Sequence, residues 1–141
     1  MINREAANAA RDVLESGGLE NLIVTKAANE YFVDYRVPRA REWELRNGVN
    51  SSLRIFGDGV VTEEAIRFPA VPDNRYGSLS RALQAAVAEA DQPYMWEEDI
   101  APADGPNLRP HLLRSGDAPA VPAKEAAKNV VRMVRAYRLS L

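Results

Sequence analysis

The residues best suited to chemistry in this sequence are five cations within residues 123–141. If that segment forms a helix with about 100° per residue, all five fall within one arc of about 120°. We call them the basic stripe: Lys124, Lys128, Arg132, Arg135 and Arg138. Because the opposite arc is apolar, such a helix docks one face and offers the stripe to an acidic partner, a phosphate backbone or a membrane surface. The alternative is a solvated face whose cations suit a helix C-terminus.

A second cluster of cations is a candidate anion site. Its members are Arg36, Arg39, Arg41 and Arg46. Arginine binds phosphate and carboxylate groups through paired hydrogen bonds, which is the chemistry such a cluster offers. Glu42 and Glu44 lie between these arginines, however, and this spacing favours local ion pairs.

Three consecutive acidic residues occupy positions 97–99. Metal-binding loops space their ligands so that several oxygens converge, and consecutive acids do this poorly. We therefore predict an acidic segment that pairs with basic residues of a neighbouring chain, including the basic stripe. The preceding residues, Tyr94, Met95 and Trp96, have large side chains that are suited to anchoring an interface.

No catalytic constellation is recognisable in the sequence. It contains no Cys and a single His, His111, which has no Ser or carboxylate at a recognisable catalytic spacing. It has no glycine-rich phosphate loop, and the Gly-Asp-Gly run at 57–59 is predicted to be a turn. We therefore predict no catalytic residues, no metal site and no cofactor, and a protein that is not an enzyme.

Charge and hydropathy restrict the partners and the location. The 18 basic and 20 acidic residues give a net charge of −2, which argues against nucleic acid as a partner. No apolar run approaches the roughly 18 residues that span a bilayer. The first residues are polar and charged, unlike a signal peptide. We expect a cytoplasmic protein, or a virion component if the protein is viral.

Two alanine-rich segments have the period of a helix. Residues 3–16 and 78–91 repeat small apolar side chains at helical spacing, and the first segment stops at the glycines 17–18. A shorter helix is expected over 39–48, just after Pro38. The small side chains predict helices that approach their neighbours closely.

Two regions have the alternation and the turn residues of antiparallel strands. Residues 22–37 predict two strands joined near Ala28 and Asn29, with a helix over 27–36 as the open alternative. Residues 52–68 predict a hairpin around the turn at 57–59.

Together these elements predict the α+β class. A small antiparallel sheet of about four strands is covered by Ala-rich helices, and a Pro-rich extended arm and a C-terminal amphipathic helix follow. Six of the nine prolines lie within 92–123. We therefore divide the chain into a compact domain 1–91, an arm 92–122 and a helix 123–141. An extended arm buries little of its own surface, so it stays ordered only if it packs on another protein surface. The sequence leaves open whether that is its own chain or a neighbour.

A compact domain followed by an arm and a docking helix, without catalytic residues, is typical of subunits that assemble with one another. We therefore expect a non-enzymatic, self-associating structural or assembly protein that forms homo-oligomers. A small head, neck or tail subunit of a bacterial virus is the concrete form of this hypothesis. One alternative is a small inhibitor that blocks a host protein complex by surface contact. Another is a ligand-binding domain or enzyme that uses the arginine cluster as an anion site.

Overall fold

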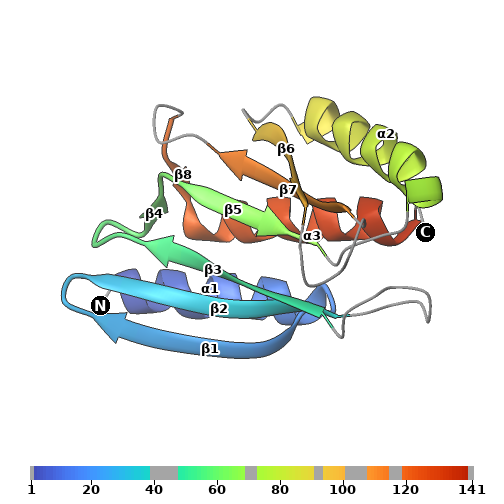
Figure 1. Cartoon of the computed structure of the whole chain (residues 1–141). Coiled ribbons are helices and arrows are strands. Elements are labelled where there is room, and N and C mark those ends of the chain that lie inside the picture. Colours follow the sequence, from blue (N-terminus) through green and yellow to red (C-terminus); the bar gives the residue numbers. More distant parts are fainter. Residues whose placement is uncertain are drawn as a thin grey trace.

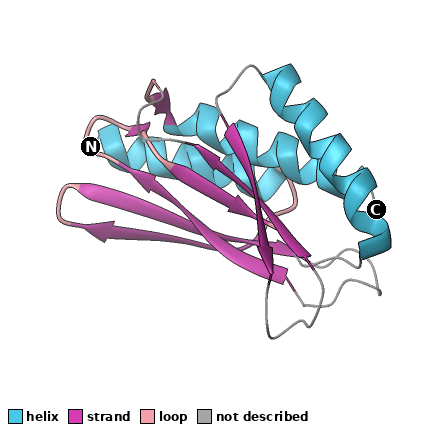
Figure 2. Cartoon of the chain, turned by 45° about the horizontal axis from the view of Figure 1, so that its top comes forward, coloured by secondary structure: helices cyan, strands magenta, loops and turns pink. Residues whose placement is uncertain are grey.

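Helices and strands form two layers in the part of the chain that the computed structural model describes, residues 2–38, 48–68, 73–90, 94–100, 108–114 and 119–139. The helices lie on one side of the strands (Figure 1, Figure 2). They are α1 (Ile2–Ser16), α2 (Asp73–Ala90) and α3 (Ala123–Leu139). The strands are β1 (Glu20–Ala27), β2 (Glu30–Pro38), β3 (Gly48–Ile55), β4 (Val60–Val61), β5 (Glu64–Arg67), β6 (Tyr94–Ile100), β7 (Leu108–Arg114) and β8 (Val121–Pro122). The predicted α+β class is confirmed.

The strand layer is divided in the middle. One antiparallel sheet has the order β1-β2-β3 and another has the order β5-β7-β6. β3 lies beside β5 (Figure 1), yet the described residues of these two strands form no hydrogen-bonded ladder. We call this boundary the split. The short strands β4 and β8 pair with one another.

The first two strands form a tight hairpin, which confirms two strands over 22–37 and excludes the helix over 27–36. Ala27 pairs with Glu30, and Ala28 reverses the chain with a φ of 51°. Side chains of β2 alternate between the core and the opposite face, as a period of two requires. The buried set is Tyr31, Val33, Tyr35 and Val37.

The first and last helices pack closely because small residues lie between them. Ala10 belongs to the buried face of α1. Just after that helix, a Cβ added at Gly17 would lie 2.4 Å from Cγ2 of Val131 in α3. Any side chain at Gly17 would therefore collide with α3. Arg138 of α3 joins the same place, since its guanidinium donates to the carbonyls of Gly17 and Gly18 at 3.4 and 3.3 Å.

α3 is an integral part of the core. Its buried face belongs to the same apolar cluster as the inner faces of β2 and β3. The apolar members from α3 are Ala123, Ala126, Ala127, Val130, Met133, Val134 and Tyr137. The Tyr137 ring stacks on Phe68, with 5.0 Å between the ring centroids. The core therefore continues past residue 91, and the predicted helices over 3–16 and within 123–141 are confirmed.

Much of the segment expected to be an extended arm consists of strands. β6 pairs with β7, and β7 pairs with β5, so these residues pack on their own chain. The inner side of β7 explains this, because Leu112 is fully buried and Arg114 is 3% exposed. Of the six prolines in 92–123, Pro110 alone lies inside β6 or β7. Averaging composition over the whole segment hides both strands. The described residues hold eight strands, against the four expected.

The hairpin expected over 52–68 is only partly present. Its turn forms, with the Phe56 N–H donating to the Val60 carbonyl at 3.0 Å. Beyond the turn, however, β4 pairs with β8 and β5 pairs with β7. β7 places Leu112 opposite Ile66, and both side chains are fully buried. This apolar pairing explains why β5 pairs with β7 and not with β3.

Two further helix predictions have different outcomes. The helix expected over 78–91 is present as α2, which begins earlier, at Asp73. The helix expected over 39–48 lies outside the described residues, apart from Gly48, where β3 begins.

Candidate functional site

Most of the basic stripe faces solvent. Lys124, Lys128, Arg132 and Arg135 are exposed, because the opposite side of α3 is buried in the core. Lys128 forms an ion pair with Glu125 at 3.4 Å on the same helix. Among the described residues, the other three exposed cations have no ion-pair partner. The stripe is therefore a positive surface whose charge is largely uncompensated.

The fifth cation of the stripe has a role inside the chain. Arg138 is half-buried and binds the carbonyls of Gly17 and Gly18, which follow the last turn of α1. A guanidinium at this position satisfies carbonyl groups that a helix leaves without partners at its C-terminus. Arg138 thus joins α3 to the end of α1.

A groove of about 340 Å³ between α2 and α3 borders the stripe. It is lined by Ala86, Glu89, Arg132, Arg135, Ala136 and Leu139. Leu139 is 82% exposed, which is unusual for a large apolar side chain. Apolar and cationic groups therefore lie side by side on this surface.

The residues expected to anchor an interface lie at the start of β6. Tyr94 is buried within its own chain, where its hydroxyl donates to Glu64. The side chains of Met95 and Trp96 lie outside those that the structure describes. The acidic residues 97–99 continue along β6, which is the outer strand of the β5-β7-β6 sheet.

One of the four clustered arginines can be placed. Arg36 lies on β2, opposite Glu20 of β1 and Asn50 of β3, and is half-buried. Arg39, Arg41 and Arg46 lie outside the described residues.

A buried polar row that sequence reasoning missed crosses the second sheet. Glu64 of β5 and Tyr94 of β6 both lie opposite Arg114 of the central strand β7. All three residues are less than a tenth exposed. The Arg114 guanidinium donates to the carbonyls of Val61, at 3.4 Å, and Thr62, at 3.0 Å, and to that of Pro119. Arg114 therefore ties the segments around β4 and β8 to the second sheet.

The row holds a carboxyl group in an environment that disfavours its charge. Burial raises the pKa of Glu64 to about 7, although the Tyr94 hydroxyl and the Arg114 guanidinium both favour the ionised form. Burial also raises the pKa of Tyr94, and the neighbouring carboxylate raises it further. Glu64 Oε2 and Arg114 Nε have no hydrogen-bond partner among the described residues. Only the register of the strands brings these three residues together, so no local pattern in the sequence predicts the row.

The chain was also compared with known proteins. No family model, curated protein or solved structure matches it. Within the described ranges, no helix is long and apolar enough to cross a bilayer. The same ranges contain no group of three or more potential metal ligands. Function is therefore inferred from the surfaces of the chain itself.

The pKa of Glu64 makes stability depend on pH. The carboxyl binds its proton more tightly in the folded chain, where its pKa is about 7, than at its ordinary value of 4.5. The free energy of unfolding should therefore fall as the pH rises from about 4.5 to about 7. The total fall should be roughly 3 kcal/mol, since a tenfold change in proton affinity is worth about 1.4 kcal/mol. Urea unfolding followed across this pH range measures it.

Glu64→Gln should remove this fall, because the amide does not titrate. The exposed neighbour Glu63 provides a matched control, and Glu63→Gln should keep the wild-type pH profile. An equally steep fall in Glu64→Gln would show that another group is responsible.

Proposed function

We propose that the protein is a non-enzymatic, self-associating assembly protein in which the basic stripe of one copy binds the acidic strand β6 of the next. The exposed stripe on α3 carries this proposal. The chain as a whole has a net charge of −2, so a face with several uncompensated cations is complementary to surfaces elsewhere on a second copy. Complementary charge steers such an encounter and fixes its register.

The acidic segment supports a second copy as the partner. Glu97 and Glu98 lie opposite His111 and Pro110 in the register of β6 with β7. β6 belongs to the strand layer, whereas the face of α3 that packs on the core is buried and its cations lie on the opposite face. One chain is therefore poorly arranged to bring its own two surfaces together, but two chains can do so.

The geometry of this contact also determines the kind of assembly. The two surfaces differ, so the contact is heterologous and repeats from copy to copy. A repeating heterologous contact closes into a ring or continues as an open chain. The apolar face of α3 and the strands of the former arm are already used within the chain. Exchange of segments is therefore not needed for the assembly.

The test is reversal of charge on the stripe. Arg132→Glu combined with Arg135→Glu should weaken self-association by at least about tenfold, because attraction becomes repulsion at the contact. Sedimentation velocity over a range of concentrations and at two salt concentrations measures this, and wild-type association should weaken as salt rises. Deletion of α3 is unsuitable, because its apolar face belongs to the core.

Two further variants sharpen this test. Lys26→Glu combined with Arg81→Glu changes the net charge equally at exposed sites off the stripe, and should associate like wild type. Glu97→Lys combined with Asp99→Lys, two positions apart on β6, should fail to associate alone but should form complexes with the Arg132→Glu, Arg135→Glu variant. A wild-type protein that keeps the mass of one chain at every concentration would overturn the proposal. So would association that is indifferent to reversal of the stripe.

A further inference from the structure

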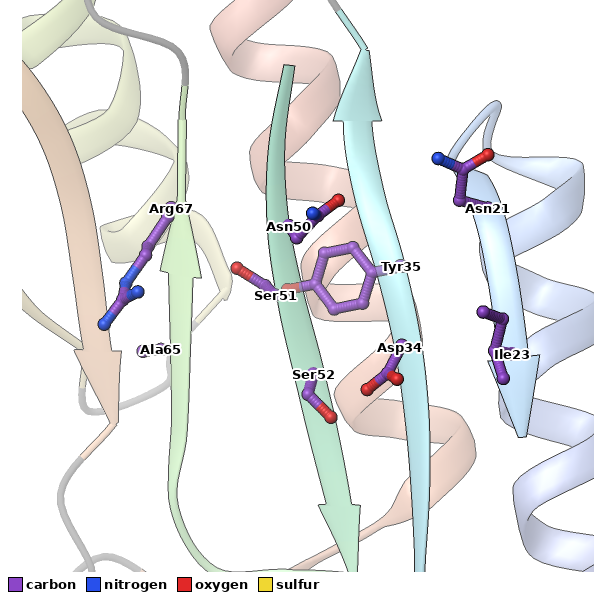
Figure 3. A pocket seen from close by; sticks show the side chains of 9 residues that line it. All are labelled: Asn21, Ile23, Asp34, Tyr35, Asn50, Ser51, Ser52, Ala65 and Arg67. Carbon is purple, nitrogen blue, oxygen red and sulfur yellow. The ribbon is translucent and has the colours of Figure 1, made fainter. Parts of the chain in front are cut away.

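A pocket of about 600 Å³ with both polar and apolar lining opens on the strand face that the helices leave uncovered, next to the split (Figure 3). It extends from β1 across β2 and β3 to β5. Its lining residues are Asn21, Ile23, Asp34, Tyr35, Asn50, Ser51, Ser52, Ala65 and Arg67. The volume lies within the range of small-molecule sites, which is about 300–1,000 Å³.

The pocket exists because the two sheets separate here. β2 and β3 remain in register beneath it, with Asp34 opposite Ser52 and Tyr35 opposite Ser51. Beyond β3 the ladder stops, and Ala65 and Arg67 of β5 form the far wall. A break in a sheet leaves side chains and backbone groups that would otherwise be covered by the next strand.

The lining is rich in groups that both donate and accept hydrogen bonds. The amides of Asn21 and Asn50 and the hydroxyls of Ser51 and Ser52 are uncharged. Two charged residues of opposite sign complete the polar lining, Asp34 and Arg67, and neither has an ion-pair partner among the described residues. The pocket therefore has no net charge.

Two hydroxyls of the lining belong to the inner side of their strands, which faces the core. Tyr35 is 1% exposed, and Figure 3 shows its ring extending from β2 toward Ser51, whose side chain points from β3 toward β5. Tyr35 Oη and Ser51 Oγ are both enclosed by the protein. A ligand in the pocket therefore meets the side chains of the opposite parity, Asp34, Asn50 and Ser52, which line the uncovered side.

We propose that this pocket binds a neutral, polyhydroxylated ligand of the sugar class. A sugar hydroxyl donates and accepts at once, and so matches the exposed Ser52 hydroxyl and the asparagine amides. The Asp34 carboxylate can accept from two adjacent hydroxyls. Ile23 and Ala65 offer apolar contact to the C–H groups of the ring. The Asp34 carboxylate repels anions and the Arg67 guanidinium repels cations, so a strongly charged ligand fits less well.

Calorimetric titration with glycerol, glucose and maltose tests the proposal, with amide chemical shifts to locate the site. Maltose, the largest probe, should bind with a Kd of about 1 mM and shift the amides of β2 and β3 around the pocket. Asp34→Ala and Asn50→Ala should each weaken binding by about tenfold or more, since each removes hydrogen bonds from the ligand. Thr25→Ala, on the exposed strand β1 but outside the pocket, is the matched control and should bind as wild type does.

The pocket is independent of the assembly contact, and the experiment keeps the two apart. The Arg132→Glu, Arg135→Glu variant should bind maltose with unchanged affinity, whatever its state of association. Absence of saturable binding by all three probes up to about 50 mM would overturn the proposal. Tighter binding of inorganic phosphate or 6-aminohexanoate than of maltose would also overturn it, because it would mark a site for charged ligands.

Discussion

Arg114→Met is expected to lower the free energy of unfolding by about 3–5 kcal/mol. The guanidinium is 3% exposed and donates to carbonyls on both sides of the short β4–β8 pair. Its removal leaves those carbonyls without a donor and leaves Glu64 buried without its cation, and both effects are costly. Urea unfolding at neutral pH, followed by circular dichroism, gives the free energy directly.

The matched control is the same substitution at an exposed arginine. Arg54 pairs with Glu30 through two hydrogen bonds of 2.7 and 2.9 Å, and its side chain is 51% exposed. Arg54→Met should cost no more than about 1 kcal/mol, as exposed ion pairs do. The double variant Glu64→Gln, Arg114→Met should be less destabilised than the sum of the two single variants, because no buried charge is left alone. If Arg114→Met lowered the free energy of unfolding as little as Arg54→Met does, the buried row would not stabilise the sheet.

Tyr137→Ala is expected to have an effect of similar size, about 3–5 kcal/mol. The Tyr137 side chain is fully buried and its ring stacks on Phe68, so truncation leaves a large cavity between α3 and the strands. The free energy of unfolding of an ordinary domain is about 5–15 kcal/mol, so the expected loss is a large fraction of it. Thermal and urea unfolding should both show one shifted, cooperative transition.

Arg135→Ala, on the exposed side of the same helix, provides the comparison and should stay within about 0.5 kcal/mol of wild type. A helix that merely docks on another chain would give the opposite pattern. Tyr137→Ala would then leave the unfolding of the isolated chain unchanged. That result would contradict the placement of α3 in the core.

Local periodicity was enough to predict the elements whose pattern is complete within a few turns. Ala6, Ala9 and Ala10 recur at helical spacing in α1, where Ala10 is buried and the other two are half-buried, and Tyr31, Val33 and Tyr35 alternate in β2. The same reasoning predicted α3, because its cations and its apolar residues occupy opposite arcs. In each case the signal lies within one element and needs no knowledge of its neighbours.

The pairing of distant segments could not be predicted in this way. β5 has four residues, and its partner β7 follows more than 40 positions later, within a segment whose prolines suggested an arm. The row of Glu64, Tyr94 and Arg114 exists only in the register of three strands. The pocket likewise depends on the lack of a hydrogen-bonded ladder between the described residues of β3 and β5, and no residue type marks that boundary. The basic stripe was predicted as a surface, whereas the role of Arg138 at the end of α1 was not.

The contact between the first and last helices has a consequence for how the chain folds. Arg138 and Gly17 meet although they are 121 positions apart, and Val131 fits against the same glycine. Contacts of such long range raise the contact order and slow folding, because the intervening loop has to close first. On the ribosome, α1 emerges well before α3, so the alanine face of α1 stays without its packing partner through most of synthesis. During that interval the nascent chain exposes apolar surface to which a chaperone can bind.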